Sequence, residues 1–201
     1  MRPSVLALLA VGIVLGTTHP VRAADRMDVG LLLGSTRATD EGQVLQFERG
    51  LTFQATPTWH VWTRDRVRVS IELLFLATPA FEVETPGASL PLEYAALFLT
   101  PGIRVTAGPN RAVTVWGAVG GGFARYSERN LKQDKSPNPA QQDTNSGALQ
   151  LGAGFDLHGF GWLGFRGELR DVFTGARNFS IATPRPKVHN VSVSGGLVVR
   201  L

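Results

Sequence analysis

The chain of 201 residues contains no cysteine. This absence excludes thiol nucleophiles, thiolate metal ligands and disulfide bonds. Small exported domains with a poor core usually depend on disulfides, so an exported chain of this composition needs another source of stability. Closure of a β-barrel in lipid would supply it, because every backbone polar group then finds a partner within the sheet.

Long hydrophobic runs are also absent beyond the first stretch of the chain. A transmembrane helix needs about 18 or more apolar residues, and the longest candidate, Leu73–Phe81, is shorter and contains Pro79. No segment shows a sustained helical period, and the 23 glycines and 12 prolines are spread throughout. If the mature chain spans a membrane, it must therefore do so with strands.

Residues 1–23 are typical of a cleavable signal peptide. Arg2 gives a basic start, residues 5–15 are almost wholly apolar, and Val21-Arg22-Ala23 offers small residues where a signal peptidase cleaves. We expect cleavage after Ala23, which leaves residues 24–201 as one mature barrel domain. The alternative is an uncleaved N-terminal anchor, although the apolar run is too short for a transmembrane helix.

The charge of the mature chain does not indicate a nucleic-acid partner. The full chain has a formal net charge of +4, and the predicted signal peptide contains Arg2 and Arg22 but no acid. The mature charge is therefore 4 − 2, or +2. The high isoelectric point of the whole chain overstates how basic the mature protein is.

Apolar and polar residues alternate along eight runs of the mature chain, the period of two that indicates β-strands. These runs are longer than the strands of most soluble sheets, and about 10 tilted residues cross a bilayer. The runs are Arg26–Ser35, Leu51–Thr63, Arg66–Thr78, Leu92–Thr106, Ala112–Tyr126, Gly147–His158, Trp162–Phe173 and Asn190–Leu201.

The connections between these runs alternate in length. Long polar connections follow the odd runs, at residues 36–50, 79–91, 127–146 and 175–188. Short ones follow the even runs, and Gly108-Pro109-Asn110 is a strong turn signal. Long loops at one rim and tight turns at the other are typical of a bacterial outer-membrane barrel. The predicted fold is therefore all-β, an eight-stranded antiparallel up-and-down transmembrane β-barrel preceded by a cleavable signal peptide.

The polar face of the runs contains charges of both signs among many small residues. A soluble, lipocalin-like barrel that binds lipid would turn the apolar face inward instead. We favour a lumen filled by a neutralised charge network, because the signal peptide, the loop asymmetry and the terminal strand all indicate a membrane barrel. The predicted network consists of Arg68, Glu72, Arg104, Asp156, Arg166, Glu168, Arg170 and Arg200.

These charges allow a gated polar channel or proton path, or a salt-bridge network that plugs the barrel. We favour the plug, because eight strands leave an interior just filled by side chains. Among the tryptophans, Trp59 is expected to anchor the barrel at the membrane interface. Trp62, Trp116 and Trp162 are expected to face the lumen.

No catalytic, cofactor or metal site is predicted, and the protein is not expected to be an enzyme. His189, Ser192 and Asp171 are expected near one rim, but His189 and Ser192 should lie on opposite faces of their strand. That placement argues against a nucleophile and base pair. No two histidines have ligand-like spacing, and the polar segment 128–145 is interpreted as a solvated loop rather than an adhesion loop.

Three features resemble the small eight-stranded outer-membrane barrel proteins, the group that includes the OmpA-like and OmpW-like barrels. They are Pro101–Val105, the glycine-rich Gly117–Phe123, and the alternating last strand that ends at Leu201. The resemblance covers essentially the whole mature chain. It implies an integral protein of the bacterial outer membrane, surrounded by outer-membrane lipid, with a structural or surface-interaction role and no cofactor. A narrow channel for small solutes is the alternative function.

The resemblance also implies that the barrel-assembly machinery recognises the C-terminal strand. Members of the group usually end in an aromatic residue, whereas this chain ends in Leu201. If the machinery contacts that residue, recognition of this chain is expected to be weaker.

Overall fold

The computed structural model describes residues 26–40, 46–82, 93–108, 112–128, 136–137, 143–175 and 188–201. The predicted signal peptide, residues 1–23, lies outside the described residues, as does most of segment 128–145. The strands are β1 (Met27–Asp40), β2 (Gln46–Arg64), β3 (Val67–Glu82), β4 (Glu93–Ala107), β5 (Val113–Glu128), β6 (Asp143–Phe160), β7 (Leu163–Thr174) and β8 (Val188–Arg200).

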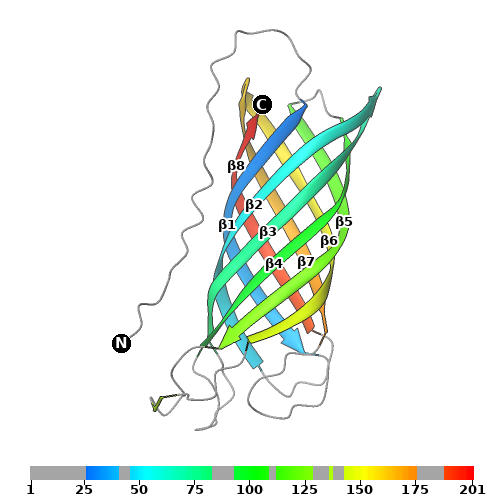
Figure 1. The fold of residues 1–201 in the computed structure, drawn as a ribbon. Helices are drawn as coiled ribbons and strands as arrows, with labels where there is room; N and C mark the ends of the chain where they lie inside the picture. Colours follow the sequence, from blue (N-terminus) through cyan, green and yellow to red (C-terminus); the bar gives the residue numbers. More distant parts are fainter. Residues whose placement is uncertain are drawn as a thin grey trace.

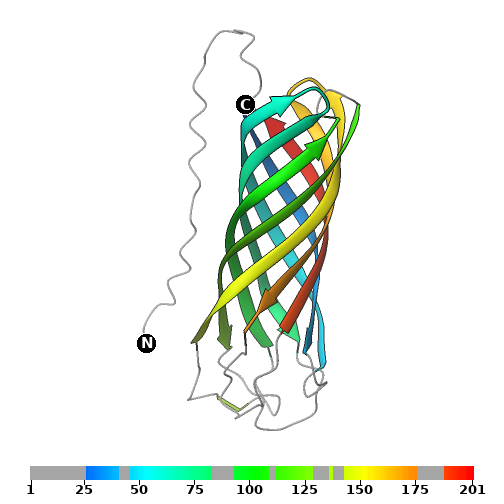
Figure 2. The same ribbon diagram turned by 90° about the vertical axis from the view of Figure 1, so that its right-hand side faces the viewer.

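The eight strands form one closed antiparallel barrel (Figures 1 and 2). Each strand pairs with the next along the chain, and β8 pairs with β1 from Asp28↔Arg200 to Asp40↔Val188. Closure leaves no free sheet edge. The prediction of an eight-stranded up-and-down barrel is therefore confirmed.

Within the described ranges, no helix is long and apolar enough to cross a membrane.

The two ends of the barrel differ, and we name them by their connections. The turn end has the connections β2–β3, β4–β5 and β6–β7 together with the C-terminus, and it is uppermost in Figure 1. The loop end has the four remaining connections. At the turn end, Asp65, Gly108 and Gly161 have positive φ angles of 49°, 68° and 54°, which suits the tight turns that the short connections predict.

The strands extend beyond the predicted runs mainly at the loop end. β1 continues to Asp40 rather than Ser35, and β3 continues to Glu82 rather than Thr78. The register of β3 against β4 shifts between Thr78 and Phe81, and Phe81 turns into the lumen, where it is fully buried. A bulge moves the following residues to the opposite face, so simple alternation could not reveal this part of the strand.

The two faces of the barrel wall have opposite character. Leu31, Val119 and Leu197 point outward and are 52%, 56% and 52% exposed. Inward residues such as Thr52 and Arg166 are fully buried. Monomeric soluble proteins rarely expose a contiguous apolar surface of this kind, so the apolar coat suits a lipid environment.

The tryptophans follow this division with two corrections to the prediction. Trp116 faces the lumen and Trp59 faces outward, as expected. Trp62 and Trp162 were expected to face the lumen but are 49% and 65% exposed. A register shift between His60 and Trp62 turns Trp62 outward, and Trp162 lies in the turn between β6 and β7.

Candidate functional site

The lumen consists of two layers of different chemistry. The charged layer occupies the part toward the turn end and contains Asp28, Gln54, Glu72, Arg104, Trp116, Gln150, Asp156, Arg166, Glu168 and Arg170. The apolar layer occupies the part toward the loop end and contains Ala38, Leu74, Leu76, Phe81, Tyr94, Ala96, Phe98, Ala124, Tyr126, Ala148, Val172 and Val188. All of these side chains are buried.

Glu72 on β3 is the centre of the charged layer. Its carboxylate accepts hydrogen bonds from Arg104 Nε on β4 and Arg170 Nη1 on β7, both at 2.7 Å. Gln150 Nε2 on β6 also donates to it at 3.1 Å. Because β3 and β7 are not neighbours in the sheet, the pair Glu72–Arg170 crosses the lumen. Glu72 therefore links opposite walls of the barrel.

A second group surrounds Arg166 on β7, closer to the turn end. Arg166 donates to both carboxylate oxygens of Asp156 on β6, at 2.7 and 2.9 Å, and to Asp28 on β1 at 3.1 Å. Trp116 Nε1 donates to the same Asp156 carboxylate at 3.2 Å. The paired hydrogen bonds from the guanidinium fix the orientation of Asp156.

Arg170 joins these contacts to the remaining members of the layer. Its Nε donates to Glu168 at 2.6 Å and its Nη1 donates to the Gln150 amide oxygen at 2.7 Å. Glu168 also accepts a hydrogen bond from Gln54 on β2. The Trp116 ring lies beneath the Arg104 guanidinium, whose Cζ is 4.0 Å from the ring centroid. The Cζ atoms of Arg170 and Arg166 are 5.2 and 5.6 Å from the same centroid. These distances allow cation–π attraction.

Six of the eight residues predicted for the lumen network come together in this layer. They are Glu72, Arg104, Asp156, Arg166, Glu168 and Arg170. Arg68 instead lies beside His60 and Thr63, with nitrogen to acceptor distances of 3.3 Å to each. Arg200 contacts the carbonyl oxygen of Gly161 at 3.4 Å. Both lie at the turn end of the charged layer, where Arg200 is the register partner of Asp28 and His60 lies between Arg68 and Asp28.

The prediction missed Asp28, Gln54 and Gln150. The alternation of β1 and β2 already placed Asp28 and Gln54 on the inward face. Their part in the network could not be inferred because it depends on which strands face each other across the closed barrel. The contacts Gln54–Glu168 and Arg166–Asp28 join residues 114 and 138 positions apart in the chain.

The apolar layer is held by stacked and edge-on aromatic rings. Phe81 and Tyr94 stack at 4.9 Å between centroids, and Phe98 meets Tyr126 edge-on at 5.8 Å. The hydroxyl groups of Tyr126 and Thr174 are 2.8 Å apart, so the polar tip of the tyrosine has a partner. This layer occupies the lumen between the charged layer and the loop end.

The chemistry available to the charged layer is limited by its arginines. Arg104, Arg166 and Arg170 are at most 2% exposed, and a guanidinium does not lose its proton in a protein. Each is paired with carboxylates from the set Asp28, Glu72, Asp156 and Glu168. Because the three arginines keep their protons and are held by these carboxylates, they do not themselves relay protons, and the arrangement suits a structural plug.

Two described histidines lie beside carboxylates, and His60 lies between Ser70 and Asp28, an arrangement of serine, histidine and acid. His60 Nδ1 is 2.9 Å from Ser70 Oγ, and its Nε2 is 3.5 Å from Asp28 Oδ2. His189 lies 3.1 Å from Asp171 on the outward face, whereas Ser192 is buried on the lumen face. No group of three or more candidate metal ligands occurs in the described part of the chain.

Neither a protein-family model nor a curated protein matches the sequence. Solved structures match the fold. The chain is similar to Neisserial surface protein A, with a TM-score of 0.61 and 9% identity over 87% of this chain and 97% of that one. It is also similar to Ail, the attachment invasion locus protein of Yersinia pestis, with a TM-score of 0.50 and 11% identity over 85% and 97%. The chain thus has the fold of the small eight-stranded outer-membrane β-barrels.

Proposed function

We propose that the protein is an integral outer-membrane β-barrel that serves envelope structure or surface interaction, without conducting solutes or catalysing a reaction. The observation that supports a plugged barrel best is the filling of the lumen. A ring of bonded charges and an adjoining layer of packed aromatic side chains both lie across it. An eight-stranded barrel is narrow enough for side chains alone to fill.

Placement in a membrane is supported by the apolar coat on the outer face. A soluble lipid-binding barrel would need that apolar face inside, around its ligand. Here the inner wall toward the turn end consists of ion pairs instead. The lipocalin-like alternative is therefore not favoured.

Fractionation of cells that express the full chain tests the placement. We expect the mature protein in the outer-membrane fraction, with gel mobility that changes on heating because the closed barrel resists detergent until it is boiled. Recovery of the mature chain from the soluble periplasm would contradict the proposal.

Single-channel recording in a planar bilayer tests the plug. We expect insertion of the purified, folded barrel without discrete conductance steps, because the buried side chains of both layers fill the lumen. Reproducible steps from protein whose fold is verified by heat-modifiable mobility would favour the narrow channel instead.

The assembly machinery is the proposed partner of β8, which closes the barrel against β1. The terminal Leu201 is 64% exposed, and its backbone nitrogen donates to the carbonyl oxygen of Met27 at 2.9 Å. Leu201→Phe restores the aromatic end that is usual in the resembled family. We expect faster appearance of the heat-modifiable form in a pulse-chase experiment, and an unchanged rate would argue against recognition of this residue.

A further inference from the structure

Two outward arginines lie directly opposite each other near the loop end of the barrel. Arg37 on β1 pairs in register with Arg49 on β2, and both side chains are exposed on the outer face. Like charges directly opposite each other on paired strands destabilise the sheet. Among the described residues, no acidic side chain forms an ion pair with either one; the ion pairs of the barrel belong to other arginines and to histidines.

Other outward charges at the loop end do have partners. Arg125 on β5 lies 2.5 Å from Asp143 on β6, and Asp171 on β7 lies 3.1 Å from His189 on β8. Arg37 and Arg125 each stand three residues before the end of their strand at the loop end (40 − 37 and 128 − 125). Among the described residues of this rim the pair Arg37–Arg49 is therefore exceptional, and it is a concentration of positive charge that an anion from outside would neutralise.

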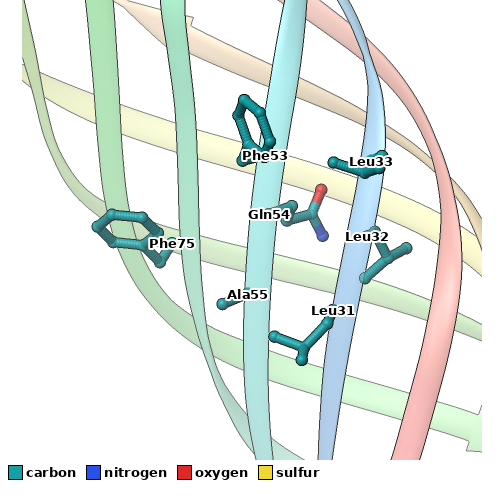
Figure 3. Close-up of a pocket in the computed structure, with 7 residues that line it drawn as sticks. All are labelled: Leu31, Leu32, Leu33, Phe53, Gln54, Ala55 and Phe75. Carbon is teal, nitrogen blue, oxygen red and sulfur yellow. The ribbon is translucent and has the colours of Figure 1, made fainter. Parts of the chain in front are cut away.

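An apolar groove lies on the same wall, on the turn-end side of these arginines. Figure 3 shows the residues that line it. It has a volume of about 320 Å³ and is lined on the outer face by Leu31, Leu33, Phe53, Ala55 and Phe75. Ala55 lies between Leu31 and Phe75 in the register of the sheet. The small side chain of Ala55 leaves the space, and the larger neighbours form its sides.

The groove and the arginines are separated by a distance that one lipid molecule can span. Leu33 and Arg37 are four residues apart on β1, as are Phe53 and Arg49 on β2. At about 3.3 Å per residue this is roughly 13 Å along the strand. A phosphate on the arginines would therefore place the acyl chain attached to it over the groove.

We infer that the outer wall of β1, β2 and β3 binds one lipid that carries a phosphate headgroup and acyl chains. The two guanidinium groups bind the phosphate, a geometry for which arginine is well suited. One acyl chain lies in the groove that Ala55 opens. The inference rests on the proposed membrane placement, and it adds a specific lipid contact at the leaflet nearest the loop end.

Native mass spectrometry of the folded barrel in detergent tests the headgroup contact. The probes are phosphatidylglycerol, which is anionic, and phosphatidylcholine with the same acyl chains, which is zwitterionic. We expect at least one phosphatidylglycerol adduct at concentrations where phosphatidylcholine gives none, and a loss of affinity of about tenfold or more in the double variant Arg37→Gln/Arg49→Gln. Arg125→Gln is the matched control, because that arginine already has Asp143, and it should bind as the wild type does.

Arg49→Glu separates binding from folding. A glutamate opposite Arg37 forms a favourable cross-strand pair, so this variant should resist urea at least as well as the wild type. Its negative charge should nevertheless abolish the preference for phosphatidylglycerol. If Arg49→Glu, folded as judged by heat-modifiable mobility, retains that preference, the arginine site is wrong.

Ala55→Trp tests the groove, with Ala153→Trp on the outer face of β6 as its control. We expect Ala55→Trp to weaken phosphatidylglycerol binding several-fold and Ala153→Trp to leave it unchanged. Soluble glycerol phosphate should compete only weakly, because it lacks the acyl chain. Equal competition by glycerol phosphate, or equal effects of the two tryptophans, would overturn the lipid assignment.

A barrel that fractionates with the outer membrane but shows no lipid preference refutes this inference alone, whereas a soluble protein refutes the proposed function.

Discussion

The charged layer and the apolar layer fill the same lumen in opposite ways. In the charged layer, Glu72 on β3 holds Arg104 on β4 and Arg170 on β7 through hydrogen bonds of 2.7 Å. In the apolar layer, Phe81, Tyr94 and Phe98 fill the space by ring contacts and form no ion pairs with one another. The outer wall is apolar around the charged layer, whereas Arg37, Arg125 and Asp171 lie on the outer face beside the apolar layer.

The comparison shows that side chains buried to the same extent can differ in how well they tolerate substitution. A buried charge that loses its partner costs about 3–5 kcal/mol, because the remaining charge is stranded in a dry interior. An apolar side chain replaced by another of similar volume costs less than about 1.5 kcal/mol. The charged layer should therefore depend on the identity of each residue, and the apolar layer mainly on its volume.

Glu72→Ala is expected to have the largest effect. It removes the carboxylate shared by Arg104 and Arg170, so the free energy of unfolding should fall by about 3–5 kcal/mol. Urea titration of the barrel in lipid vesicles measures this. Leu74→Met on the same strand is the control for the apolar layer and should cost less than about 1.5 kcal/mol. Equal losses in the two variants would remove the distinction between the layers.

Val193→Arg tests whether the outer wall faces lipid. Val193 lies midway along β8 and is 62% exposed. An arginine on the lipid face near the bilayer centre should destabilise the barrel by about 2–4 kcal/mol. The neighbouring Ser192→Ala points into the lumen and should have a much smaller effect in the same urea titration. A larger loss for Ser192→Ala would reverse the assignment of the two faces.

Trp116→Phe makes a smaller change within the charged layer. It keeps a ring beneath Arg104 but removes the hydrogen bond from Nε1 to Asp156. Because a hydrogen bond to a charged group contributes about 1.5–3 kcal/mol, we expect a loss of that order or less. An unfolding energy equal to that of the wild type would mean that the ring alone supports the layer.

Phe98→Ala should leave conductance unchanged, which makes it the smallest expected effect in a functional assay. The substitution opens the apolar layer, but Arg104, Arg166 and Arg170 still occupy the lumen next to it. Planar-bilayer recordings should therefore remain without discrete steps. If steps appear in Phe98→Ala, the apolar layer rather than the charged layer is the barrier.

Much of this architecture could be predicted from local pattern. Alternation placed Glu72, Arg104 and Arg166 on the lumen face, and the alternating lengths of the connections indicated the antiparallel order of strands. The prediction went wrong at Trp62, which lies beside a register shift. It also placed Phe81 in the connection 79–91, whereas β3 continues past a second register shift to Glu82. A bulge reverses the face of every residue after it until the register is restored, and its position depends on the partner strand.

By itself the sequence determined the period of two, the number of strands and the separation of an apolar from a polar face, because these properties follow from the geometry of an extended backbone. Only the tertiary structure decided which inward residues meet. Closure of the barrel brings Asp28 to Arg166 and Gln54 to Glu168 across the lumen, and the register between the consecutive strands β1 and β2 places Arg37 opposite Arg49 on the outside. Those pairings depend on strand register and barrel curvature, which link residues far apart in the chain.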